Sequence, residues 1–161
     1  MIRDANPSDA PALASLWNPW ITGTAITFNP VPKSADDIAA MIFARQAGGQ
    51  AFVLAEKEGG LLGFATYGQF RGGPGYAHTM EHTVILNPGA RGHGHGRALM
   101  AAVEDHARLA GHRLMIGAVS GENTEGRAFH EAVGYTLYGT LPQAGFKFGR
   151  HMDLWLLGKL L

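Results

Sequence analysis

The most constraining feature of the sequence is a run of glycines at alternate positions, 92, 94 and 96, flanked by arginines at 91 and 97. The run follows a strand-like segment, 78–86, and precedes a segment whose apolar residues recur at helical spacing. Because glycine has no Cβ, such a loop can curl until several backbone N–H groups point inward, and the dipole of the next helix adds positive potential. A strand, a glycine loop and a helix in this order predict a cradle for an anion such as phosphate.

The spacing of the glycines excludes two common nucleotide-binding motifs. The phosphate-binding loop of nucleotide hydrolases needs Gly-Lys-Ser or Gly-Lys-Thr, which the chain lacks. The dinucleotide fingerprint needs G-x-G-x-x-G early in the chain, whereas this loop reads G-x-G-x-G in the middle. By itself the loop predicts a phosphate-bearing ligand, and a merely flexible surface loop is the alternative interpretation.

Strand-like and helical patterns alternate on both sides of the loop. We expect helices over about 7–20, from a Ser34 cap to Gly48-Gly49, from about Gly94 to Gly111, and over 124–133. We expect strands near Ile2, over 51–55, 61–67, 78–86 and 113–119, and on both sides of 145–150. This order, β-α-α-β-β-β-α-β-α-β-β, predicts an α/β (α+β) fold with an antiparallel start and a parallel crossover in the middle. The 161 residues fit one domain, 1–161, that buries its own core.

Charge and composition argue against several classes of partner. Thirteen Lys and Arg balance thirteen Asp and Glu, so the chain lacks the broad basic surface that nucleic acid or an anionic membrane would require. There is no cysteine, which removes disulfides and a thiol nucleophile. No apolar run approaches the roughly 20 residues of a spanning helix, and the first residues do not resemble a secretory signal. We therefore expect a soluble, cytoplasmic protein.

Two histidine spacings could suggest a metal site, His93-x-His95 and His78-x-x-x-His82. On a strand, residues four apart share a face but lie about 13 Å apart, which is too far for them to bind one ion together. The pair at 93 and 95 lies in the glycine loop, which phosphate binding explains better. We therefore expect no metal.

The loop also resembles a known family motif. The GNAT acetyltransferase superfamily shares a pyrophosphate motif, Arg/Gln-x-x-Gly-x-Gly/Ala, which Arg91–Gly96 matches. The segments 81–84 (Glu-His-Thr-Val), 129–135 (Phe-His-Glu-Ala-Val-Gly-Tyr) and 145–150 (Gly-Phe-Lys-Phe-Gly-Arg) are similar to the phosphinothricin and methionine sulfoximine acetyltransferases, and the resemblance covers essentially all 161 residues. It implies the GNAT fold: a mixed, mostly antiparallel central sheet splayed around acetyl-CoA, with helices on both faces.

The resemblance implies which residues hold acetyl-CoA. The central strand would pair with the pantetheine arm through Val84, Ile85 and Leu86, and a backbone N–H near Val84 would stabilise the developing oxyanion. Asn123 would cap the last helix and contact the pantetheine or a bound water. The pyrophosphate would lie on the glycine loop, which consists of Arg91, Gly92, His93, Gly94, His95, Gly96 and Arg97.

Two side chains are implied as catalytic. Glu81 lies just before the cofactor-facing residues, where a carboxylate could take the proton that an ammonium substrate must lose before it attacks the thioester. A salt-bridged strand glutamate is the structural alternative. His130 stands where most of the superfamily has a tyrosine thought to protonate the departing thiolate, and the similar subfamily also has histidine there. Either His130 or water would supply that proton.

The implied substrate is a small amino acid analogue such as phosphinothricin or methionine sulfoximine. Arg71 is the candidate for binding its carboxylate, because a guanidinium can donate two parallel hydrogen bonds. Phe28, Tyr76 and His78 are candidate pocket walls, and ordinary packing is the alternative for each. A homodimer is also implied, in which the partner's region around Lys147 helps to shape the pocket.

Two departures from the family pattern leave the substrate open. The segment 27–30, Thr-Phe-Asn-Pro, lacks the acidic or Asn-Glu character common there, and Ala77 stands where relatives often have arginine or another polar residue. The alternatives are an acetyltransferase for another amine, such as an aminoglycoside, a polyamine or a protein amino terminus, and a non-catalytic acyl-CoA sensor. The neutral charge and Arg71 argue against polycations, and Glu81 argues against the sensor.

Overall fold

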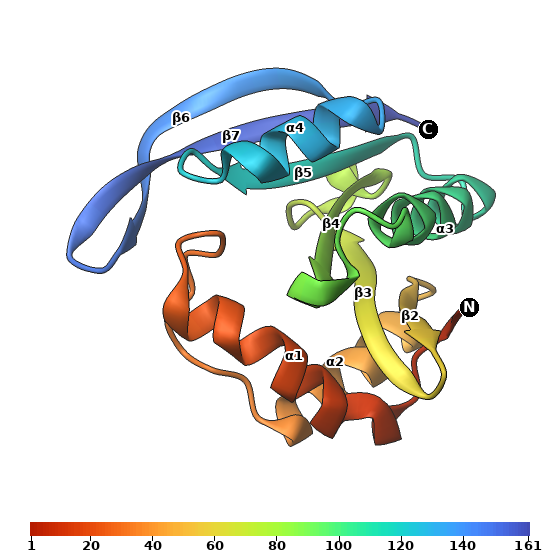
Figure 1. The fold of residues 1–161 in the computed structure, drawn as a ribbon. Helices are drawn as coiled ribbons and strands as arrows, with labels where there is room; N and C mark the ends of the chain where they lie inside the picture. Colours follow the sequence, from red (N-terminus) through yellow and green to blue (C-terminus); the bar gives the residue numbers. More distant parts are fainter.

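Seven strands form one sheet, in the order β1-β2-β3-β4-β5-β7-β6, in the computed structural model, which describes residues 1–161. The strands are β1 (Ile2–Asp4), β2 (Phe52–Lys57), β3 (Gly60–Gln69), β4 (Thr79–Leu86), β5 (Leu114–Ser120), β6 (Thr136–Lys147) and β7 (Arg150–Leu160). The helices are α1 (Ala10–Gly23), α2 (Ala35–Ala47), α3 (His95–Leu109) and α4 (Thr124–Ala132). The order of elements and the mixed, mostly antiparallel sheet confirm the predicted fold (Figure 1).

The strands β4 and β5 form the one parallel pair of the sheet, and they separate after a few residues. Their pairing covers Thr79–Glu81 of β4 and Leu114–Ile116 of β5. On its other side β4 stays paired with β3 from Met80 to Leu86. From His82 onward the edge of β4 that faces β5 therefore has no strand partner, and the sheet is splayed there.

The direction of the backbone shows which groups face this gap. The N–H of Asn87, just after β4, donates to the carbonyl of Leu62 beside it (2.8 Å), so the odd-numbered residues of β4 direct their backbone groups toward β3. Alternate residues of a strand direct these groups to opposite sides. The N–H and C=O groups of His82, Val84 and Leu86 therefore point into the gap between β4 and β5.

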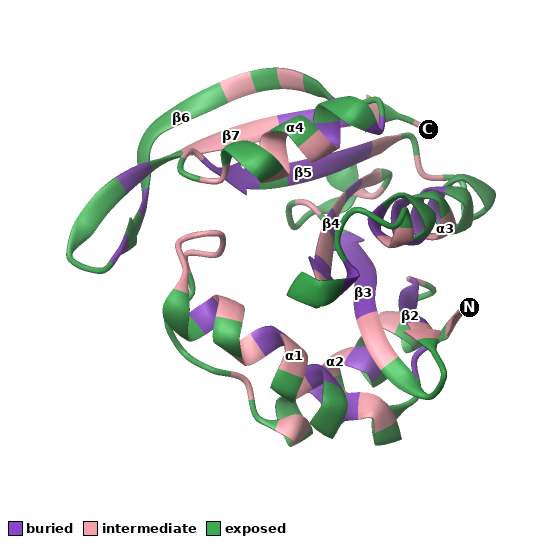
Figure 2. Ribbon diagram, in the orientation of Figure 1, coloured by how far each residue is buried: buried purple, intermediate pink, exposed green.

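Helices cover both faces of the sheet (Figure 1). α1 and α2 pack on one face over a core that includes Trp17 and Phe64, and α3 packs on the other over a core that includes Ala65 and Leu99. Phe64 and Ala65 are neighbours in β3 and belong to opposite cores because strand side chains alternate between faces. Figure 2 shows buried residues recurring at intervals along the helices and filling much of β3 and β5. No helix combines the length and the apolar composition needed to cross a membrane.

Two element boundaries differ from the sequence-based expectation. α1 runs to Gly23, past Trp20, although Pro19 lies inside it. Trp17 and Ile21 are both buried, so the packing of this last part outweighs the hydrogen bond that proline cannot donate. The last two strands meet at Phe148-Gly149 alone, so 145–147 belong to β6. Both turn residues have positive φ, 53° and 72°, as a two-residue hairpin turn favours.

Candidate active site

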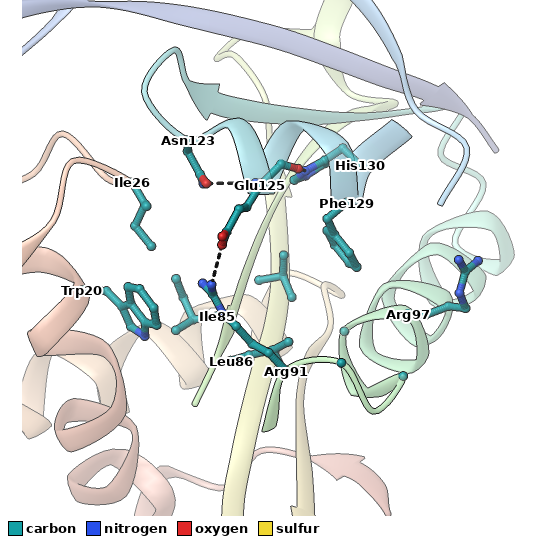
Figure 3. Close-up of a pocket in the computed structure, with 15 residues that line it drawn as sticks. Trp20, Ile26, Ile85, Leu86, Arg91, Arg97, Asn123, Glu125, Phe129 and His130 are labelled. Atoms are coloured by element: carbon teal, nitrogen blue, oxygen red, sulfur yellow. Dashed lines mark hydrogen bonds and ion pairs between the residues drawn. The ribbon is translucent and has the colours of Figure 1, made fainter. Parts of the chain in front are cut away.

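A cavity of about 450 Å³ opens beside the splayed part of β4 (Figure 3). Its walls come from the end of β4, the glycine loop with the start of α3, the helix α4, and the end of α1 with the loop that follows it. Every predicted cofactor residue except His93 and His95 lines this cavity. The lining residues are Trp20, Ile26, Val84, Ile85, Leu86, Arg91, Gly92, Gly94, Gly96, Arg97, Asn123, Glu125, Gly126, Phe129 and His130.

The glycine loop has the backbone that an anion cradle requires. Gly92 and Gly94 have φ of 78° and 82°, in the left-handed region that residues with a side chain disfavour. Gly94 is the N-cap of α3 and offers no capping side chain, so the first N–H groups of the helix have no side-chain acceptor. Gly96 is buried, and a Cβ there would lie 3.2 Å from Leu86 and Phe129. The missing side chain therefore lets α3 begin close to both β4 and α4.

Arg91 connects three walls of the cavity. Its Nη1 donates to Oε2 of Glu125 on α4 (2.9 Å), and its Cζ lies 4.8 Å from the centre of the Trp20 ring on α1. Arg91 and Glu125 are both exposed, so this ion pair is weak. An incoming anion can therefore replace Glu125 as the partner of Arg91 at a small cost in free energy. Arg97 points away from Arg91 in Figure 3 and donates to the carbonyl of Ala132 (3.3 Å).

The two histidines of the loop do not face the cavity. The Nδ1 of His93 lies 2.8 Å from the carbonyl oxygen of Arg91, and because a carbonyl only accepts, Nδ1 carries the proton. The rings of His93 and His95 lie 6.2 Å apart. No group of three or more His, Cys, Asp or Glu side chains is placed to hold a metal ion.

A family model described as the acetyltransferase (GNAT) family matches residues 14–135, a span that includes the splayed strand, the glycine loop and α4. The chain belongs to this family. This GNAT enzyme is similar to the L-methionine sulfoximine/L-methionine sulfone acetyltransferase of Salmonella typhimurium, with 33% identity over 95% of this chain and 90% of that protein. It shares 32% identity with the phosphinothricin N-acetyltransferase of Alcaligenes faecalis, over 99% of this chain and 82% of the other.

A solved structure agrees with these relatives. The acetyltransferase yncA of Salmonella typhimurium, solved with its cofactor acetyl-CoA, has a TM-score of 0.95 and 32% identity to this chain. The similarity covers 100% of this chain and 93% of that one. This GNAT enzyme is accordingly an acetyl-CoA dependent N-acetyltransferase.

The residues of the cavity fit acetyl-CoA. The open glycine loop and Arg91 suit a pyrophosphate, and the gap-facing backbone groups of Val84 and Leu86 suit the amides of a pantetheine arm. Asn123 caps α4, because its Oδ1 accepts from the N–H of Gly126 (2.9 Å). Its amide nitrogen has no partner in the chain and remains able to donate to a ligand.

Glu81 lies at the apex of the splay, as the last residue of β4 that pairs with β5. It lies two and four residues before Thr83 and Ile85, so it points to the face covered by α1 and α2, and it is not part of the cavity lining. Burial raises the pKa of Glu81, and the positive charge of Arg45 partly opposes this rise. Glu81 forms no ion pair in the chain. A partly buried, unpaired carboxylate with a raised pKa is a stronger proton acceptor than an exposed carboxylate.

His130 is buried in the cavity wall, and both of its ring nitrogens are occupied. Nδ1 lies 2.6 Å from the carbonyl oxygen of Gly126, and Nε2 lies 3.0 Å from Nε2 of His82. The carbonyl places the proton on Nδ1, so in the neutral ring Nε2 accepts from His82. Burial lowers the pKa of His130, which favours this neutral form. Neutral His130 therefore has no free N–H for a thiolate.

His82 completes a stacked pair of imidazoles between β4 and α4. The two ring centres lie 5.0 Å apart, and a Cβ at Gly117 would lie 2.7 Å from the ring of His130 and 2.9 Å from Nε2 of His82. Glycine at 117 therefore makes room for the pair. Burial, together with repulsion from His130, lowers the pKa of His82 to about 3.

None of the predicted substrate residues lines the cavity. Arg71 and Tyr76 lie between β3 and β4, where Cζ of Arg71 is 5.5 Å from the centre of the Tyr76 ring. The ring of His78, just before β4, lies 6.0 Å from that of His112. Phe28, after α1, packs its ring against the backbone of Gly145 in β6.

The geometry gives Lys147 a different role from the implied one. Its ammonium is buried within its own chain and donates to the carbonyls of Ile21, Thr24 and Thr27 at 2.5, 2.6 and 2.7 Å. Burial lowers the pKa of this ammonium. All three donors are used, so Lys147 ties the end of β6 to the end of α1 and has none left for a substrate or for a partner's pocket.

Several residues of the site were not expected from the sequence: the cavity walls Trp20, Ile26, Glu125 and Phe129, and Arg45 beside Glu81. One signal was available, because Glu125 and Phe129 are four residues apart on a helix and share a face. The other residues have no such signal. Only the packing of α1 and α2 against the sheet brings them to the site.

Proposed function

We propose that this enzyme transfers the acetyl group of acetyl-CoA to the amino group of a small amino acid analogue, such as phosphinothricin or methionine sulfoximine. The observation that carries the proposal is Glu81, a partly buried, unpaired carboxylate at the apex of the splay where the cofactor groove begins. The similar enzymes from Salmonella typhimurium and Alcaligenes faecalis are named for these two substrates.

Glu81 acts as the general base. Acetyl-CoA supplies an acetyl thioester, which is open to attack by an amine lone pair. An ammonium has no lone pair, so Glu81 takes its proton, directly or through a water molecule. Burial raises the pKa of Glu81 toward that of the amine, which makes the proton transfer less unfavourable. A positioned base of this kind contributes typically about 10²–10⁴-fold to the rate.

The backbone and solvent complete the proton and charge transfers. The N–H of Val84 points into the gap and donates to the oxygen on which negative charge develops. Water protonates the departing thiolate, because the Nδ1 proton of His130 is held by the carbonyl of Gly126. His130 then acts by fixing the cavity wall between β4 and α4.

Arg71 is the proposed ligand for oxygen atoms of the substrate, such as those of a carboxylate, phosphinate or sulfoximine group. Its guanidinium is exposed and has no acidic partner in the chain, so it can donate two parallel hydrogen bonds. Phe28, Tyr76 and His78 are proposed to flank the substrate. We also propose that the enzyme forms a homodimer and is located in the cytoplasm.

Release of the CoA thiol, measured with a panel of amines, tests the proposal. The panel contains phosphinothricin, methionine sulfoximine, an aminoglycoside, a polyamine and a peptide with a free amino terminus. We expect the two amino acid analogues to give the fastest release, matched by acetylated product. A preference for the aminoglycoside, the polyamine or the peptide would replace the substrate class. Binding of acetyl-CoA without faster release for any amine would support the non-catalytic sensor.

A further inference from the structure

An arginine outside every recognised motif lies beside Glu81. A Cβ added at Gly68 would lie 2.6 Å from Cζ of Arg45, so the guanidinium of this α2 residue rests directly on the backbone of β3. Gly68 is the register partner of Glu81 in the β3–β4 pairing, and side chains of paired residues share a face of the sheet. The guanidinium and the carboxylate are therefore neighbours on the face covered by α1 and α2.

The guanidinium of Arg45 is unpaired although it is partly buried. The side chain makes no hydrogen bond or ion pair in the chain, and its Nε is buried without an acceptor. Arg45 and Glu81 sense each other's charge but do not form an ion pair. Buried donors without acceptors are rare in proteins and call for an explanation. The N–H groups of a guanidinium form a planar fork that fits the two oxygens of a carboxylate. Because those of Arg45 are unpaired, they can bind a carboxylate from outside the chain.

We propose that Arg45 binds the α-carboxylate of the substrate. The inference rests on the proposed acetyl transfer with Glu81 as base. In an α-amino acid the amino group and the carboxylate share one carbon atom, so a substrate with its ammonium at Glu81 presents its carboxylate within a few ångströms of that point. The unpaired guanidinium on Gly68 is the cationic group that stands beside Glu81. The site is therefore built for free α-amino acids, and Arg71 is left for the side-chain end of the substrate.

This arrangement also explains why residue 68, in the buried last part of β3, is a glycine. Gly68 is buried, and its φ is not positive, so its backbone does not require glycine. Glycine is required because the guanidinium of Arg45 occupies the space that a side chain at position 68 would fill. Gly68→Ala would keep the charge of Arg45 but displace its head group, because the end of an arginine side chain moves more easily than a strand.

The test compares two substrates on four proteins. The substrates are L-methionine sulfoximine and its α-carboxamide, which differ in the charge of one group. The proteins are the wild type, Arg45→Met, Gly68→Ala and Arg108→Met, whose arginine is exposed on α3 and pairs with Asp105. Turnover is measured as kcat/KM, and binding of the same two compounds to the CoA-loaded proteins is measured by calorimetry.

We expect Arg45→Met to lower the preference for the acid over the amide by about 10- to 100-fold in both measurements, because charge-assisted hydrogen bonds to the carboxylate are lost. Gly68→Ala lowers the preference in the same direction, and Arg108→Met leaves it unchanged. Equal losses on acid and amide would show that Arg45 acts on Glu81 or on the fold, and would overturn the inference while acetyl transfer stands. Selective binding of the acid without turnover would leave the inference standing and overturn the proposed function. A wild type that binds neither compound would overturn both.

Discussion

At the scale of single residues, the site depends on where a few protons are held. The carbonyl of Gly126 fixes the Nδ1 proton of His130, and His82 donates to the remaining nitrogen. Nδ1 of His82 is buried without a partner, so the pair is stable only while both rings are neutral. Glu81 differs, because its proton affinity is raised and no residue of the chain pairs with it.

The buried imidazole pair predicts acid-sensitive stability. The pKa of His82 is about 3 in the folded protein and near the ordinary 6.5 in the unfolded chain. Between these two pH values the unfolded chain binds a proton on His82 that the folded protein does not. Stability is therefore fully present above pH 6.5 and falls toward pH 3, by up to about 1.4 kcal/mol per pH unit. We expect His82→Gln to flatten the decline of Tm between pH 6.5 and 4.5. The exposed His151→Gln serves as the control, and identical slopes in all three proteins would refute the assignment.

Residues that belong to a local sequence pattern could be predicted from the sequence. Residues that reach the site only through the packing of distant elements could not. Alternating glycines at 92, 94 and 96 implied a curled loop, and two of them have the positive φ this requires. Glu81 was found by motif, but its neighbour Arg45 lies on a separate helix with no sequence periodicity that points to β4. Lys147 was also singled out by a motif, but no sequence pattern pointed to its contacts with the end of α1 and the loop after it.

At the scale of elements, the cavity is held between parts that are far apart in the chain. Lys147 fastens the β6–β7 hairpin to the carbonyls at the end of α1, and Phe28 packs on Gly145 of the same hairpin. The loop after α1 carries Ile26, a cavity wall. The order of helices and strands was predictable from periodicity, but these cross-connections were not, because no local pattern specifies which loop a distant hairpin will contact.

Removing the Lys147 contact should loosen this wall. Lys147→Met leaves three carbonyls without their donor, and we expect a loss of about 1–3 kcal/mol in the free energy of unfolding. Acetyl-CoA binding should weaken as well, since the segment that carries Trp20 and Ile26 is no longer held. Thermal unfolding and calorimetry measure both effects, with Lys57→Met in the β2–β3 hairpin as the control. Unchanged Tm and affinity would contradict the role assigned to this lysine.

The ion pair between the glycine loop and α4 should oppose cofactor binding. Glu125 places a carboxylate at the proposed pyrophosphate site and pairs with Arg91. Glu125→Gln removes this competitor, so we expect acetyl-CoA to bind about 2- to 5-fold more tightly at low salt, the range of a weak surface ion pair. Glu131→Gln, which breaks a comparable pair with Arg127 on the same helix, is the matched control. Weaker binding by Glu125→Gln would show that Glu125 itself helps to hold the cofactor.

At the scale of the whole molecule, the sheet is one structure with a local break. Two cores pack on opposite faces of β2, β3 and β4, and the core under α3 continues to β5 and β7 through Met115, Val119 and Leu157. Backbone pairing joins β4 to β5 at only three residue pairs. The predicted crossover from β4 through α3 to β5 is present, and its short pairing creates the gap in which the cofactor is proposed to bind. Periodicity predicted the crossover, but the length of the pairing depends on side-chain packing and was not readable from the sequence.

The edge strand β6 and the following turn expose several large apolar side chains, and this supports the proposed homodimer. Tyr138, Leu141, Phe146 and Phe148 are between 41% and 60% exposed. We expect the protein to sediment as a dimer, and Leu141→Ser combined with Phe146→Ser to sediment as a monomer. A wild type that sediments as a monomer at micromolar concentration, with full activity, would rule out the dimer as part of the site.

The pH dependence of kcat/KM for the wild type and Glu81→Gln tests the central claim most directly. With methionine sulfoximine as substrate, wild-type activity should rise as Glu81 loses its proton, at a pH above the usual carboxylate range because burial raises its pKa. Glu81→Gln should lose about 10²–10⁴-fold near neutral pH and recover at alkaline pH, where the amine is already deprotonated. The exposed Glu58→Gln should follow the wild type. A Glu81→Gln profile that matches the wild type in height and shape would contradict the account.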